Sequence, residues 1–129
     1  MFLLMDSLYL LNLDFISEMT IEYEPLHPLR ERGKHAYPED DYEHAGIVAI
    51  GPVPRKEMSD DQYRALAMEI PVFFRQEVWV GQFWKAQIIY RGIIEALRDR
   101  DTLLIDIGAI EREVDGRLDQ GFEKDSIYA

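Results

Sequence analysis

The architecture of this chain depends on the segment Val78-Trp-Val-Gly-Gln-Phe-Trp-Lys-Ala-Gln-Ile-Ile-Tyr-Arg-Gly-Ile-Ile-Glu-Ala-Leu97. From Gly81 to Arg98 the apolar residues recur at the spacing of a helix, and most of them share one broad face. Trp84 and Ile88 are exceptions, because they lie one turn apart on the face that otherwise carries charges. The pattern therefore predicts a central helix with a core face and a small apolar patch among its charged residues.

Helical patterns also flank this segment. Ser59 and Gln62 have the spacing of a capping box, which predicts a helix start, and Pro71 is expected to kink or restart that helix. Apolar residues three and four apart predict another helix over residues 109–119. We therefore expect residues 59–120 to form a helical core with aromatic-rich central helices.

Residues 102–108 fit two structures. We assign them to a helix, and a strand over 103–107 is the alternative because Gly108 would interrupt a continuous helix. Glycines at positions 81 and 92, with Ala96 one turn after the second, leave room for a close crossing between helices.

Before the helical core the pattern changes to β-structure. The β-branched run from Gly46 to Pro54 predicts a strand that is buried on both faces, and the alternation from Thr20 to Tyr23 predicts a shorter strand. Prolines predict a long loop over residues 24–45. Residues 1–18 are expected to be an N-terminal extension, docked on the core or flexible, with a short helix over 6–19.

Length and composition indicate one folded unit. The 129 residues correspond to a single domain, 1–129, and 47% of them are apolar or aromatic. The expected class is mainly α, or α+β with one or two short strands. No segment approaches the ~20 apolar residues of a membrane span, so we expect a soluble, cytoplasmic protein that does not bind membranes.

The charge of the chain is strongly acidic, with 25 acids against 14 bases. A protein that binds nucleic acid needs a basic face to neutralise phosphates, so nucleic-acid binding is disfavoured. Residues 59–100 carry six charges of each sign, whereas both flanks are acidic. Acidic flanks of this kind usually keep a protein soluble, and the alternative is a surface that attracts a basic partner.

One loop has the composition of a metal site. His35, Asp40 and His44 lie in the run His35-Ala-Tyr-Pro-Glu-Asp-Asp-Tyr-Glu-His44, and His27 is nearby. Such groups bind divalent cations when they converge, but their spacing fits neither a helical histidine pair nor a calcium loop. A solvated acidic loop is the simpler interpretation, and the three residues are only candidates.

The sequence shows no catalytic constellation. There is no cysteine, which excludes disulfides, thiolate nucleophiles and sulfur-ligated zinc. No serine lies in a nucleophile elbow, and the glycines from 46 to 51 lack the pattern of a phosphate-binding loop. We therefore expect a protein without enzymatic activity and without a cofactor.

The function that fits these observations is association with another protein. We expect a regulatory subunit, an adaptor or an inhibitor of the immunity or anti-defence kind, with Trp84 and Ile88 as interface anchors. Cover by another segment of the same chain, such as the N-terminal one, is the alternative for these two residues. Lys85, Arg91 and Glu95 would form the rim, and the acidic flanks would steer a partner with a basic surface. Two alternatives remain: a metal-dependent enzyme or ligand-binding protein using loop 27–44, and a structural protein that forms oligomers.

Overall fold

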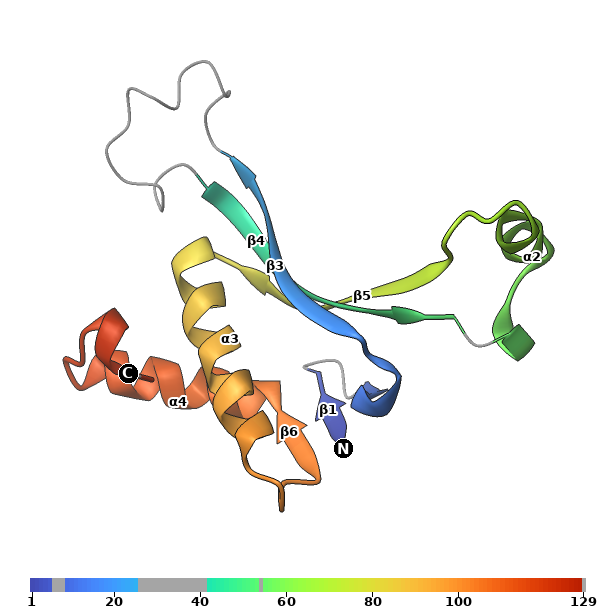
Figure 1. The fold of residues 1–129 in the computed structure, drawn as a ribbon. Helices are drawn as coiled ribbons and strands as arrows, with labels where there is room; N and C mark the ends of the chain where they lie inside the picture. Colours follow the sequence, from blue (N-terminus) through green and yellow to red (C-terminus); the bar gives the residue numbers. More distant parts are fainter. Residues whose placement is uncertain (6–8, 26–41, 54, 129) are drawn as a thin grey trace.

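The computed structural model describes residues 1–5, 9–25, 42–53 and 55–128. Within these residues the chain is an α+β protein with two three-stranded sheets and three α-helices (Figure 1). The expected mainly α class is therefore wrong. The strands are β1 (Phe2–Leu4), β2 (Leu10–Asn12), β3 (Glu18–Pro25), β4 (Tyr42–Pro52), β5 (Phe73–Gly81) and β6 (Leu104–Asp106). The helices are α2 (Asp60–Ala67), α3 (Phe83–Arg98) and α4 (Ile107–Asp119), with 3-10 turns η1 (Leu13–Phe15), η3 (Arg55–Glu57) and η4 (Lys124–Ser126).

The first sheet has β1 in its centre. β1 runs antiparallel to β2 and parallel to β6, and this register places Leu3 beside Leu11 and Ile105. All three side chains are buried. The helix expected over residues 6–19 is wrong in its described part, because Leu11 belongs to strand β2 and pairs with Leu3.

The second sheet has β4 between β3 and β5, with both pairings antiparallel. The strands expected at Thr20–Tyr23 and Gly46–Pro54 are confirmed, and each begins earlier than expected. Neighbouring residues Ile47 and Val48 point to opposite faces of the sheet, and both are fully buried. β4 is thus the buried centre of this sheet, as its unbroken apolar run indicated.

Strand β5 replaces helical structure in the region expected to be a helical core. A register shift opposite Ile47 and Val48 leaves Val78 as an extra residue, so that Val78 and Trp79 are both buried. Such a β-bulge breaks the two-residue alternation by which a strand is recognised. The expectation of helices throughout 59–120 failed here because the bulge hides the strand period.

Helix α3 is the element around which the core is assembled. It lies against β3, β4, β5, β6 and α4, and its residues Ala86, Ile89 and Ile93 have no exposed surface. The helix expected from Gly81 to Arg98 is thus confirmed. At Gly92 a Cβ would lie 2.8 Å from Cγ2 of Ile110 on α4, so this glycine does permit a close helix crossing.

The last part of the core combines a strand and a helix. Residues 104–106 form β6 rather than the helix assigned to 102–108, because they pair with β1. Asp106 then caps α4 by accepting a hydrogen bond from the Ala109 amide. The helix expected over 109–119 is confirmed and begins two residues earlier.

Gly51 lies where β4 passes close to the backbone of η1. A Cβ at this position would collide with the backbone carbonyl of Phe15, and the Ser17 amide donates a hydrogen bond of 2.9 Å to the Ile50 carbonyl beside it. The backbone after η1 therefore lies directly against β4.

We predict that Gly51→Ala lowers the free energy of unfolding by about 2 kcal/mol or more, because a backbone cannot move aside as a side chain can. Gly116→Ala is the matched control: this glycine is within α4, and its Cβ would meet nothing within 4 Å. The control should gain about 0.5–1 kcal/mol of stability from helix propensity. Urea unfolding followed by circular dichroism measures both, and equal effects would contradict the packing at Gly51.

Candidate functional site

The five residues expected to form an interface lie on α3 but differ in their surroundings. Ile88 is only 3% exposed and belongs to the core. The Trp84 indole is partly buried: Nε1 donates a hydrogen bond of 2.8 Å to Gln82 Oε1, and Lys124 Nζ lies 4.0 Å from the ring centroid. The C-terminal segment, residues 122–128, thus reaches the expected patch.

The C-terminal segment is held in place by specific contacts. After α4, Gly121 has a φ of 90°, and the Phe122 amide donates a hydrogen bond of 3.0 Å to the Arg117 carbonyl. This reversal is a Schellman motif. Arg117 in turn donates a 2.6 Å hydrogen bond to the carbonyl of Ile127, whose side chain is buried.

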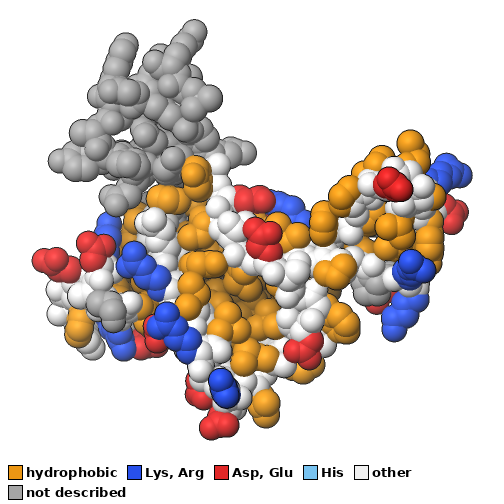
Figure 2. Space-filling model, in the orientation of Figure 1, with side chains coloured by type: hydrophobic (Ala, Val, Ile, Leu, Met, Phe, Trp, Pro, Cys, Tyr) orange, Lys and Arg blue, Asp and Glu red, His pale blue; other side chains and the backbone are white. Residues whose placement is uncertain are grey.

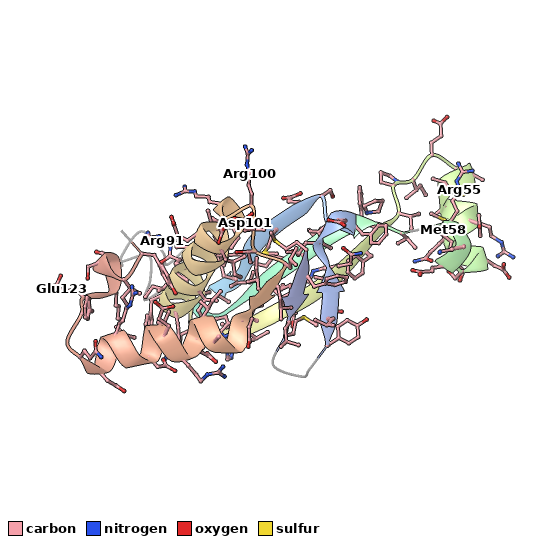
Figure 3. The ribbon with its side chains drawn as sticks, turned by 90° about the horizontal axis from the view of Figure 1, so that it is seen from below. Arg55, Met58, Arg91, Arg100, Asp101 and Glu123 are labelled. Carbon is pink, nitrogen blue, oxygen red and sulfur yellow. The ribbon has the colours of Figure 1, made fainter. Side chains whose placement is uncertain are left out.

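A hollow of about 430 Å³ remains between α3 and the C-terminal segment. Arg91 and Glu123 lie at this end of the molecule (Figure 3). Arg91 is exposed, and Glu95 is engaged by Arg98 at 2.7 Å. The residues that line the hollow are Trp84, Gln87, Ile88, Arg91, Leu118, Phe122, Glu123, Lys124 and Asp125.

Lys85 takes part in an ionic network within the chain. Its Nζ lies 2.8 Å from Asp115 Oδ1 and 3.3 Å from Glu111 Oε2. Glu111 also accepts a 2.9 Å hydrogen bond from the Trp79 indole. Burial lowers the pKa of Lys85, but the hydrogen bond with Asp115 and the charge of Glu111 outweigh it, so the pKa is raised overall. The network ties β5, α3 and α4 together.

A second surface, which the sequence did not reveal, is formed by residues 55–73. These residues, named here the arm, contain η3 and α2 and lie at the end of β4 and β5, away from α3 and α4 (Figure 1). Arg55 and Met58 mark this end of the molecule in Figure 3. The expected capping box of Ser59 and Gln62 is confirmed, with both hydrogen bonds present.

The arm is tied internally but not covered by the described residues. The Tyr63 hydroxyl donates to the Arg55 carbonyl, and the Ile70 amide donates a 2.9 Å hydrogen bond to the Ala65 carbonyl. Glu69 adopts a φ of 61° to make this turn, a conformation that costs a side-chain-bearing residue about 1 kcal/mol. No residue of α2 is buried.

The arm instead carries exposed apolar side chains, named here the apolar row. Their exposed fractions range from 38% at Leu66 to 72% at Met68, and the full row is Tyr63, Leu66, Met68, Ile70 and Phe73. Hydrophobic side chains gather both on the arm and on the middle of the body (Figure 2). A helical spacing of Tyr63, Leu66 and Ile70 is visible in the sequence, but it equally fits a helix that packs on a core.

A groove of about 640 Å³ separates the arm from β2 and η1. Its wall on the body consists of uncharged residues, whereas its wall on the arm includes Lys56, Glu57 and Gln62. The complete lining is Tyr9, Leu10, Leu11, Asn12, Phe15, Pro52, Val53, Lys56, Glu57, Gln62 and Phe74.

The metal-site candidates fall mostly outside this description. His35 and Asp40 lie outside the described residues, as does most of loop 27–44. His44 is exposed and lines a shallow hollow with Glu22, Arg75 and Glu77. Across the described part of the chain, no three histidine, aspartate or glutamate side chains gather closely enough to hold a metal ion.

The hollow beside His44 is dominated by one exposed ion pair. A hydrogen bond from Arg75 lowers the pKa of Glu22, and the same hydrogen bond raises the pKa of Arg75. Arg75 lies 3.8 Å from Glu77 as well. Glu22, Arg75 and Glu77 thus pair with one another beside His44 on the exposed surface of the sheet.

Comparisons with known proteins assign no family: no protein-family model, curated protein or solved structure matches this chain. None of the helices in the described residues is both long and apolar enough to cross a membrane.

We predict that Lys85→Met destabilises the protein by about 1–2 kcal/mol near neutral pH, because Glu111 and Asp115 lose their shared cation. Folding raises the pKa of Lys85 above its ordinary value of 10.5. The stabilisation of the fold by the Lys85 charge is therefore complete below pH 10.5 and is lost as the pH rises through the folded-state pKa. The difference between the variant and the unmodified chain should therefore shrink at strongly alkaline pH.

Urea unfolding at neutral and alkaline pH tests this prediction. Lys56→Met serves as the control, because Lys56 is exposed on the arm. It should change stability little at either pH. A Lys85→Met difference that persists unchanged at alkaline pH would rule out the ionic origin of the effect.

Proposed function

We propose that the protein acts by binding another protein, in the role of a regulatory subunit, adaptor or inhibitor, and that the arm is its contact surface. The observation that carries this proposal is the exposure of the apolar row along the arm, whose helix α2 has no buried residue. Five large side chains that are each about half exposed leave roughly 500 Å² of apolar area, at ~100 Å² for each. Patches of that size on soluble proteins mark interaction sites.

The internal ties of the arm favour binding. The capping box and the hydrogen bonds of Tyr63 and Ile70 hold α2 in its helical form before any partner arrives. A surface that is already ordered loses little conformational entropy on association, so more of its contact energy appears as affinity. Tyr63 and Leu66, the two members of the row within α2, lie three residues apart, which is the spacing of anchors on a helix that docks into a groove of its partner.

The α3 patch supports the proposal less well than the arm. Ile88 is buried among the chain's own side chains, and Lys85 is paired with acids of α4. A partner could reach Trp84 only beside Lys124 and the rest of the C-terminal segment. Trp84, Ile88, Lys85, Arg91 and Glu95 therefore stay a predicted interface, and the arm is the surface we propose.

A photo-crosslinking amino acid at position 66 tests this proposal in the organism that makes the protein. We expect irradiation to give a covalent adduct of discrete mass, because Leu66 lies in the apolar row. The matched control places the same amino acid at Leu97, a leucine of α3 with similar exposure, 43% against 38%. A second change, Ile70→Glu, should abolish the adduct from position 66.

Either a self-adduct or an adduct with a different protein agrees with association through the arm. Equal labelling from positions 66 and 97, or no adduct from position 66, would refute the arm as the contact surface.

A further inference from the structure

We infer that the partner of the arm is a second copy of this chain, with each arm lying in the groove of the other copy. This inference rests on the proposed function, because it names the partner of the same surface. The two surfaces it joins are the apolar row of the arm and the groove wall formed by β2 and η1. Both are exposed on the described part of one chain.

The groove offers an apolar site of the right kind. Tyr9, Leu10 and Phe15 form its wall on the body, and each is more than half exposed. Leu10 belongs to β2 and Phe15 to η1, so the sheet and the adjoining turn hold both in place. A volume of about 640 Å³ is within the range of hollows that bury apolar groups.

The arm cannot fill the groove of its own chain in this structure. The groove is lined on the arm side by Lys56, Glu57 and Gln62, and no member of the apolar row is part of the lining. The row is exposed to solvent and does not border the groove of its own chain. A second molecule is needed to bring an apolar row into the groove.

Charge distinguishes a second copy from a basic partner. The arm carries four acids and three bases, while the rest of the chain carries 21 acids and 11 bases. A basic protein would gain most from the acidic surface outside the arm. The arm and the uncharged groove wall are the surfaces on which two copies of an acidic chain meet with little repulsion.

The available area agrees with a stable dimer. Eight large side chains, five in the apolar row and three in the groove wall, are each about half exposed, and together they offer ~800 Å² per copy. One partner contributes about that area to an interface of standard size. Exchange of arms is also self-complementary, as a two-fold axis requires, because each copy gives one arm and one groove.

The first measurement is sedimentation velocity of the purified chain over a range of concentrations. We expect a monomer–dimer equilibrium for the unmodified chain and at least a tenfold weaker dimer for each of two variants. Leu66→Glu alters the arm, and Leu10→Glu alters the groove wall. Leu97→Glu, the same change at an exposed leucine of α3, should leave the dimer unchanged.

Mixing the two weakened variants gives the decisive result. The arm of the Leu10→Glu chain and the groove of the Leu66→Glu chain are both intact, so the mixture should form heterodimers with one of the two contacts. Contact between two arms, or between two grooves, would not be rescued in this way. Thermal unfolding by circular dichroism checks that each variant is folded, and Met68→Glu and Phe15→Glu replace any variant that is not.

The dependence of dimer affinity on salt concentration provides an independent test. Two chains of net charge −11 repel each other, and salt screens that repulsion, so the dimer should strengthen as the salt concentration rises. A basic heterologous partner would be released by salt instead. A chain that is monomeric at all concentrations and salts overturns the dimer, and an adduct from position 66 with a different protein would then leave only the proposed function standing.

Discussion

Burial of the α3 isoleucines is the contact that joins the two sheets into one structure. Ile89 and Ile93 have no exposed surface, and α3 lies against strands of both sheets as well as α4. Each fully buried side chain of this size stabilises the fold by about 1.5–3 kcal/mol relative to leaving it in water. Loss of this packing would separate β6 and α4 from the larger sheet, so the ionic network of Lys85 and the close approach at Gly92 both depend on it.

The sequence revealed those parts of the fold whose signals are local. The periodicity of α3 and α4, the capping box at Ser59 and the β-branched run of β4 each depend on residues close together in the chain. It failed where long-range pairing determines the structure. β1, β2 and β6 are three residues each, too short for a period, and they exist because distant partners align their leucines and isoleucine. Strand β5 was missed because the bulge at Val78 breaks its alternation.

The candidate site shows the same limit. The helical spacing of Tyr63, Leu66 and Ile70 is typical of a core helix, but in the structure α2 ends at Ala67 and all three side chains are exposed. Conversely, Trp84 and Ile88 looked exposed on a helical wheel, but the C-terminal segment and the core surround them. The surroundings of Trp84 depend on how the chain returns after Gly121. Gly121 marks the end of the helix in the sequence, but the contacts that place the returning segment, the Arg117 hydrogen bond to Ile127 and Lys124 over the Trp84 ring, are not visible in the local sequence.

The parallel pairing of β1 with β6 has a consequence for how the protein is made. Phe2 pairs with Leu104 and Leu4 with Asp106, so β1 can meet its parallel partner only after β6, the last of the described strands, has been synthesised. β3, β4, β5 and α3 can assemble while synthesis continues, whereas β1 has only the edge strand β2 as a neighbour until β6 emerges. An isolated two-stranded pair is marginal in water. Closure of the small sheet therefore depends on a contact between residues far apart in the sequence, and such long-range pairing is the kind that slows folding.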